Sequence, residues 1–299
     1  MAGQARKLGH RLIAARPAIA SAASEQSAAG QASLAGAGST WATLTFAALT
    51  FGWTWSLWGI SDLVRQDLPG LSKACVLAAG FGPSLAALFV VLMFAGVSGT
   101  IWWWHRCMAW RLRLRWYGVA FLAAPVAMLA ALAIDGALGG SLPAPTGVRP
   151  FGAAVAQFAL VLIIGGPAGE EFGWRGYALP VLTARLGWRW SSLIVGALWG
   201  VWHVPLFFMA GTGQSQMPMM LFLSSALALS IIFARLAMNT GFSVIPAILV
   251  HWSINSWSLV IPVIPTGGNI RPFALLMGLL FAAAAAAFLK PGPKLPAPV

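Results

Sequence analysis

The chain has 299 residues, of which 59% are hydrophobic and only 8% are charged, and its formal net charge is +12. A soluble domain carries about 25% charged residues, so this composition excludes an ordinary soluble protein and predicts an all-α, polytopic integral membrane bundle. The two cysteines are too few for a disulfide framework and match no metal-ligand spacing. The basic residues stand in short connections beside apolar stretches, where they meet lipid headgroups, so we expect a lipid bilayer and no nucleic acid as partner.

Residues 1–40 are basic and rich in Ala, Gly, Ser and Gln, which predicts a disordered tail. An arginine-rich transit peptide is an alternative that this composition leaves open. About eight transmembrane helices are expected after the tail, at 41–60, 74–97, 117–136, 153–174, 191–210, 217–237, 242–262 and 272–289. The fourth can continue as helix towards Leu182. We therefore expect one transmembrane domain over residues 41–290, with a short tail at 291–299.

Lysine and arginine are unevenly divided between the two sets of connections. With the N-terminus inside, the inner set holds 14 of the 18 basic residues, and the outer set holds Arg65, Lys73, Arg149 and Arg271. Basic residues favour the cytoplasmic side, so we expect an integral protein of the cell (inner) membrane with both termini cytoplasmic. The connection 101–118 interleaves Trp and Arg, which predicts an amphipathic helix or hairpin in the cytoplasmic interface.

Glu170 and Glu171 stand side by side in the fourth apolar stretch, although the chain has only six acidic residues. Carboxylates inside a membrane are costly and indicate a functional site by default. Glu171 and Arg175 are four residues apart in the orientation that favours an ion pair, while Glu170 points about 100° away. A packing ion pair alone is the structural alternative, and it leaves Glu170 unexplained.

Glycines recur every four residues around these carboxylates, at Gly165, Gly169 and Gly173. This spacing puts all three on one helix face. The face predicts close packing against another helix.

Two histidines and an asparagine complete the candidate set. His203 lies in the predicted fifth span, and His251 lies in the seventh, one turn before Asn255. Each residue taken alone is more often a hydrogen-bonded core residue. Together with the two carboxylates and Arg175, they can satisfy one another only by converging. We therefore expect one cavity lined by Glu170, His203, His251 and Asn255 and open towards the cytoplasm.

Three motifs in this order resemble those of a known family. E-E-x-x-x-R appears as Glu170 to Arg175, F-x-x-x-H as Trp199 to His203, and H-x-x-x-N as His251 to Asn255. The set resembles the CPBP intramembrane proteases, which include the type II CAAX prenyl proteases and the bacteriocin-processing proteins. The resemblance covers a motif-bearing core at about residues 100–262. Trp199 replaces the motif's Phe, which keeps a large aromatic ring and affects only the pocket shape.

The resemblance implies an intramembrane endopeptidase that hydrolyses a peptide bond of a membrane-associated protein or peptide. Glu170 would activate water, which His203 would help to hold. His251 and Asn255 would donate to the oxyanion, and Glu171 with Arg175 would orient these groups. The rival mechanism uses His203, His251 and Glu170 as zinc ligands. The sequence leaves metal dependence open, with the metal-free mechanism preferred.

Other function classes use similar residues. A proton-coupled carrier also needs intramembrane Glu, His and Arg, but the chain shows no inverted repeat. A non-catalytic membrane scaffold or immunity protein is the other alternative, and the presence of all three motifs argues against it. Nothing in the sequence specifies a prenylated client or an oligomeric state.

Overall fold

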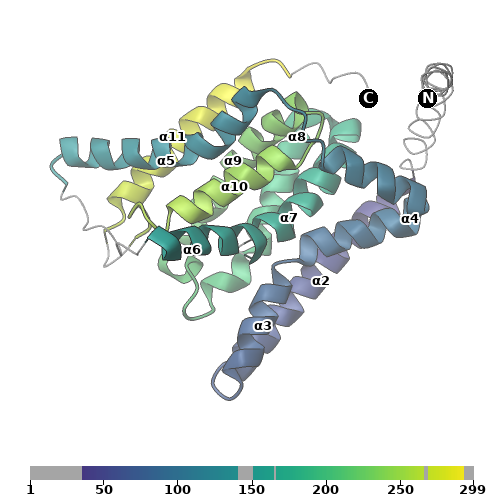
Figure 1. Cartoon of the computed structure of the whole chain (residues 1–299), viewed down its shortest axis with the longest axis horizontal. Helices are drawn as coiled ribbons and strands as arrows, with labels where there is room; N and C mark the ends of the chain where they lie inside the picture. The colour runs from purple at the N-terminus through teal and green to yellow at the C-terminus, as the bar shows by residue number, and fades with distance from the viewer. Residues whose placement is uncertain (1–35, 141–150, 165, 266–268, 293–299) are drawn as a thin grey trace, which may run out of the picture.

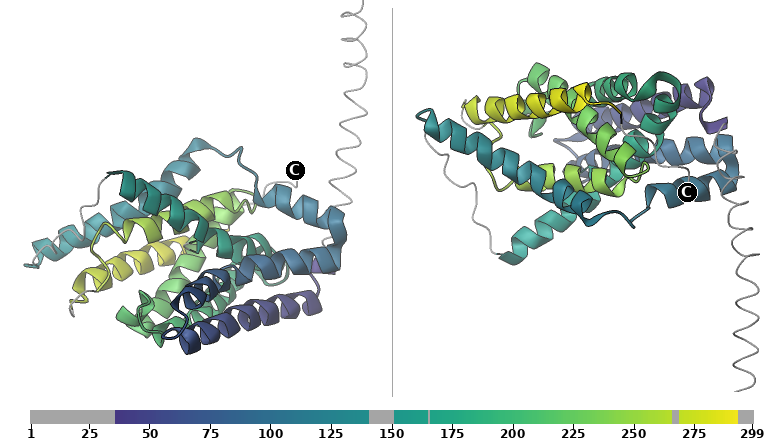
Figure 2. Two further views of the ribbon diagram at one scale, coloured as in Figure 1. Left: turned by 60° about the horizontal axis from the view of Figure 1, so that its bottom comes forward. Right: turned by 90° about the horizontal axis from the view of Figure 1, so that it is seen from above.

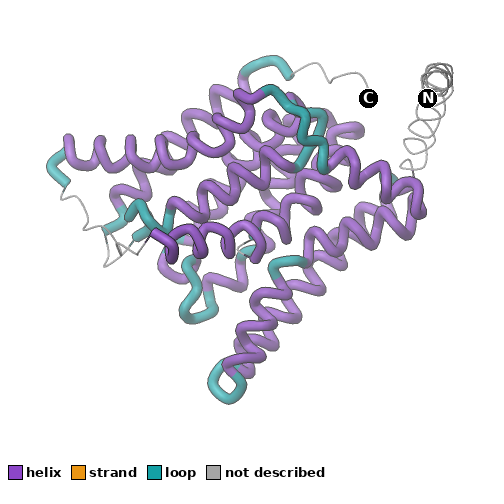
Figure 3. Tube along the Cα trace, in the orientation of Figure 1, coloured by secondary structure: helices purple, strands orange, loops and turns teal. Residues whose placement is uncertain are grey.

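The computed structural model describes residues 36–140, 151–164, 166–265 and 269–292. Figure 3 shows a bundle of helices joined by loops, so the predicted all-α class is confirmed. Most of the predicted N-terminal tail and residues 293–299 of the C-terminal tail lie outside the described ranges.

The first helices form one side of the molecule (Figure 1). Helix α2 (Thr40–Val64) begins at Ser39, whose side-chain oxygen accepts a hydrogen bond from the Ala42 amide at 3.1 Å. Helix α3 (Pro69–Ala79) begins with a proline, which suits the first helical position. Helices α3 and α4 (Gly82–Cys107) both pack against α2.

Two breaks divide the predicted second span. The first separates α3 from α4 at Gly80 and Phe81. The second is a kink inside α4 at Gly96, whose φ of 66° and ψ of −169° favour glycine. Residues 97–107 therefore form a separate helical stretch. The predicted amphipathic connection is helical up to Cys107 and irregular over 108–113.

Four helices form the opposite side of the molecule. They are α5 (Leu114–Ala137), α9 (Met219–Asn239), α10 (Ile245–Trp257) and α11 (Arg271–Leu289). Helix α10 packs on α5, and α11 packs on both α5 and α9. Figure 2 shows the same helices from two further directions.

The predicted fourth span is a broken helix between these two sides. It comprises α6 (Phe151–Ile164), the short α7 (Pro167–Gly173) and a π-helical turn η1 (Trp174–Ala178). Gly166 has a φ of 108° and precedes Pro167, so a new helix begins just before the two carboxylates. Helix α7 contacts α4 on one side and α10 on the other.

Helix α8 (Leu179–Trp202) follows η1 without a loop, so the chain is helical beyond Leu182 as expected. The C-terminal boundary predicted for the fifth span, residue 210, was wrong. The helix ends at Trp202, and His203 is the helix C-cap, followed by the 3₁₀ turns η2 (Val204–Phe207) and η3 (Gln214–Gln216). Pro205 disfavours helical backbone at Val204, which explains the early end.

Among the described residues, five helical segments are long and apolar enough to cross a membrane. They are Gly82–Cys107, Leu114–Ala137, Gly152–Trp202, Met219–Asn239 and Arg271–Leu289. The predicted seventh span is reduced to α10, whose 13 residues extend about 20 Å, less than the roughly 30 Å of hydrocarbon. The third of the five segments covers the predicted fourth span and most of the fifth, with a kink at Gly187 between them. The chain is a polytopic helical membrane bundle, as predicted.

The bundle has two ends of different composition. At the first end, Arg189 Nε donates to the Phe288 carbonyl at 2.9 Å, Arg235 donates to the Pro291 carbonyl at 2.9 Å, and the Val244 amide donates to the Cys107 carbonyl at 2.9 Å. We call this the basic end, and it lies at the upper right in Figure 1. The distal end, at the lower left, carries the α2–α3 turn and residues 203–218.

Candidate functional site

Helix α7 is held close to its neighbours by two glycines. A Cβ atom on Gly169 would collide with the Gly80 carbonyl, and one on Gly173 would collide with the Pro83 carbonyl. The predicted bare face is therefore present at these two positions and packs on the α3–α4 break. Gly165 lies outside the described residues.

Glu171 is the centre of a buried charged group. Its Oε1 accepts hydrogen bonds from Arg175 at 3.0 Å and from His251 Nδ1–H at 2.8 Å. The Arg175 guanidinium also lies over the rings of Trp199 and Phe233, at 4.2 and 4.4 Å from their centroids. The exposed fractions of Glu171 and Arg175 are 0% and 1%, so each charge depends on the other for compensation. The predicted ion pair is confirmed.

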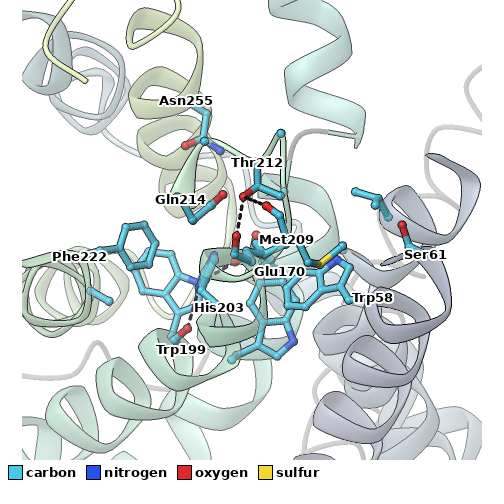
Figure 4. Close-up of a pocket in the computed structure, with 18 of the residues that line it drawn as sticks. Trp58, Ser61, Glu170, Trp199, His203, Met209, Thr212, Gln214, Phe222 and Asn255 are labelled. Carbon is cyan, nitrogen blue, oxygen red and sulfur yellow. Dashed lines mark hydrogen bonds between the residues drawn. The ribbon is translucent and has the colours of Figure 1, made fainter. Parts of the chain in front are cut away.

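Glu170 faces a different environment from its neighbour. Its Oε2 accepts a hydrogen bond from Trp199 Nε1–H at 2.6 Å, and the side chain lines a cavity of about 480 Å³ (Figure 4). From the sequence, Trp199 was predicted to change only the pocket shape. The signal for its role was available, because tryptophan carries an N–H donor that the motif's phenylalanine lacks.

His203 is oriented by the helix that it ends. Its Nδ1 lies 2.8 Å from the Trp199 carbonyl oxygen. Because a carbonyl can only accept, this contact assigns the proton to Nδ1 and leaves Nε2 as an acceptor in the neutral ring. The ring packs edge-on against Trp202 and Phe222 in the cavity wall.

Gly166 marks the point that the polar groups share. An ideal Cβ at this glycine would lie 2.7 Å from Glu170 Oε1, 3.5 Å from His251 Nε2 and 3.6 Å from Asn255 Nδ2. All of these residues line the cavity, together with His203. The structure thus brings the four predicted cavity residues together, with Glu171 and Arg175 packed behind them.

The predicted zinc ligands are not grouped around one point in this structure. Within the described ranges, no group of three His, Cys, Asp or Glu side chains is arranged to hold a metal ion. The set of His203, His251 and Glu170 is therefore not assembled as ligands in this conformation. Nδ1 of His251 is bonded to Glu171 and Nδ1 of His203 to a backbone carbonyl, which leaves Nε2 of each ring as the nitrogen that could bind a metal.

The cavity reaches the distal end of the bundle. All of its exposed lining residues lie there: Asp62, Arg65, Ala210, Gly211 and Gly213. The sequence predicts both that the basic connections face the cytoplasm and that the cavity opens to the cytoplasm. These two expectations cannot both hold, because the cavity opens at the end opposite the basic one.

The comparisons with known proteins place the motifs in one matched segment. Residues 152–257 match the model of the type II CAAX prenyl endopeptidase Rce1-like family. A curated relative, CAAX prenyl protease 2 of Methanococcus maripaludis, is 31% identical over 126 residues, which cover 36% of this chain and 46% of the relative. The chain thus aligns with less than half of that relative's length. The segment that carries all three motifs is thus similar to the type II CAAX prenyl endopeptidase, or CPBP, family.

Proposed function

We propose that this chain is an intramembrane endopeptidase that hydrolyses a peptide bond of a membrane-associated protein or peptide. One observation carries the proposal: a buried carboxylate, an imidazole and an amide face a common point beside Gly166 inside one cavity. The family match of the surrounding segment supports the same reaction class.

Glu170 is the proposed general base. Trp199 holds Oε2, while Oε1 faces the shared point and would accept a proton from a water molecule there. His203 Nε2 would accept the second hydrogen bond of this water and so help to orient it. The resulting hydroxide would form the new C–O bond at the substrate carbonyl.

His251 and Asn255 are the proposed oxyanion donors. Because Nδ1 of His251 donates to Glu171, its Nε2 faces the cavity on the same side as the Asn255 amide. With a proton on each ring nitrogen, His251 would donate from Nε2 to the developing oxyanion. Glu170 would then pass its proton to the leaving amine as the C–N bond breaks. Glu171 and Arg175 are positioning residues in this scheme.

The direct test is Glu170→Gln, which keeps the shape and removes the base. Newly formed peptide termini would be measured by mass spectrometry in membranes of cells that express the full chain. We expect the wild-type cleavage products to fall about 10²–10⁴-fold with Glu170→Gln. Asp67→Asn, an exposed carboxylate outside the cavity, should leave them unchanged. Cleavage at the wild-type rate by Glu170→Gln would contradict the proposal and favour a scaffold or carrier.

A second variant tests the shared point itself. Gly166→Ala would place a carbon 2.7 Å from Glu170 Oε1 at a φ of 108°, so we expect cleavage to be lost. Gly118→Ala is the matched control, because a Cβ there meets no atom within 4 Å. Equal cleavage by both variants would show that the space beside Gly166 is not used.

A further inference from the structure

Charge separates the two ends of the bundle. The basic end carries Arg106, Arg111, Arg113, Arg115, Arg185, Arg189, Arg235 and Lys290, and no acidic residue of the described ranges lies there. At the distal end, the described cations are Arg65, Lys73 and Arg271. They are balanced there by Asp62, Asp67 and Asp135.

This asymmetry orients the bundle in a membrane. Lysine and arginine in short connections are retained on the cytoplasmic side, while acidic residues contribute little to orientation. Arginines at the basic end also lie over neighbouring indoles, as Arg115 does over Trp116 and Arg189 over Trp188, which suits an interface with lipid headgroups. The basic end therefore faces the cytoplasm, and the distal end faces outward.

The cavity joins the buried carboxylate to the distal end. Its inner part is formed by Glu170, Trp199 and His251, and its exposed residues come from the end of α2 and the segment 210–213. None of the eight basic-end cations lines it. A peptide that reaches Glu170 through this opening comes from the distal side.

We propose that the cavity opens to the non-cytoplasmic side of the membrane, so that its substrates are extracytoplasmic segments of membrane-bound or exported proteins. The side from which a substrate reaches the cavity is inferred from the position of the cavity opening and from the distribution of basic residues between the two ends. The statement about substrates rests on the proposed endopeptidase function.

The cavity walls indicate the chemistry of such a segment. Large apolar side chains line the space around Glu170, among them Trp58, Trp202, Leu206 and Phe222. At the opening, Asp62 and Arg65 cancel each other's charge. The walls therefore suit an uncharged, apolar stretch of peptide, such as the part of an extracytoplasmic segment that borders the bilayer.

The test labels one cysteine on each side of the full-length protein. Gly213→Cys lies at the opening, where an added Cβ meets no atom within 4 Å, and Ala109→Cys lies in the exposed connection at the basic end. Both native cysteines, Cys75 and Cys107, are buried, so the wild-type chain measures the background. The probe is a membrane-impermeant maleimide applied to intact spheroplasts and then to lysed ones.

We expect Gly213→Cys to be labelled in intact spheroplasts and Ala109→Cys only after lysis. Labelling of Ala109→Cys in intact spheroplasts, with Gly213→Cys protected until lysis, would overturn the proposal and place the opening in the cytoplasm. Labelling is read on the protein itself, so the test does not depend on catalysis. Adding Glu170→Gln to Gly213→Cys should leave its labelling unchanged even though cleavage is lost, which separates failure of the access side from failure of the proposed function.

Discussion

The two walls of the cavity differ in origin and in chemistry. The motif wall is polar and comes from the matched segment 152–257; it consists of Glu170, Trp199, His203, His251 and Asn255. The facing wall comes from α2 and α3, outside that segment, and consists of Trp58, Ser61, Asp62, Arg65, Ser72 and Val76. Figure 4 shows Glu170 between Trp58 and Ser61 on one side and His203 and Phe222 on the other.

This difference suggests that the two walls have separate roles in the proposed reaction. The motif wall holds every group that the proposed mechanism needs for proton transfer and oxyanion binding. The facing wall holds none of these groups and contributes to the shape of the cavity. We infer that substitutions in the motif wall and its support change the rate, while those in the facing wall change which peptide is accepted.

The largest effect on stability and cleavage rate is expected at Glu171, which lies behind the motif wall. Glu171→Gln keeps an acceptor for His251 but leaves Arg175 as an uncompensated buried charge, which should cost about 3–5 kcal/mol of stability and also lower the rate. Thermal unfolding in detergent and the cleavage assay measure the two effects. Adding Arg175→Met should recover much of the stability and little of the rate. If Glu171→Gln alone were as stable as the wild type, the ion pair would not be needed for folding.

A smaller effect is expected at Trp199, within the motif wall. Trp199→Phe restores the family motif's residue and keeps an aromatic ring near Arg175, but removes the 2.6 Å hydrogen bond to Glu170. A hydrogen bond to a charged group contributes about 1.5–3 kcal/mol, so the rate should fall about tenfold to a hundredfold. Trp190→Phe, at an exposed indole, is the control. An unchanged turnover number in Trp199→Phe would show that the indole only fills space.

Local patterns predicted part of this site, and packing decided the rest. The Glu171–Arg175 pair follows from a spacing of four residues on one helix, so the sequence alone predicted it. The contacts of His251 with Glu171 and of Trp199 with Glu170 join residues 80 and 29 positions apart. They depend on how α7, α8 and α10 meet, which helix periodicity does not encode.

The same limit applies to the fold. Apolar stretches located the helices, but not the break at Gly166 or the end of α8 at Trp202. Gly–Pro and the nearby Pro205 were the available signals for these two features. The side on which the cavity opens could not be predicted either, because it depends on where the ends of α2, α3 and α8 come together.

A still smaller effect, on substrate preference, is expected from a substitution in the facing wall. Val76→Ala removes two methyl groups from the α3 side of the cavity, at a residue that has no role in the proposed mechanism. Loss of one or two methyl groups in an apolar pocket changes the preference between substrates by about 1 kcal/mol or more, so KM should shift while kcat stays constant. Val97→Ala, at an exposed position outside the cavity, should change neither constant. A fall in kcat alone would contradict the division between the two walls.

The smallest effect is expected from metal removal. The three side chains that a zinc site requires are not assembled in the described part of the chain. If the motif wall works through Glu170 as base, treatment of the purified protein with a chelator should leave cleavage unchanged while Glu170→Gln still abolishes it. Loss of cleavage on chelation, with recovery on adding Zn²⁺ and about one metal ion bound per chain, would contradict this expectation. It would mean that His203, His251 and Glu170 rearrange around a metal, so the motif wall would act as a ligand set rather than as a base with oxyanion donors.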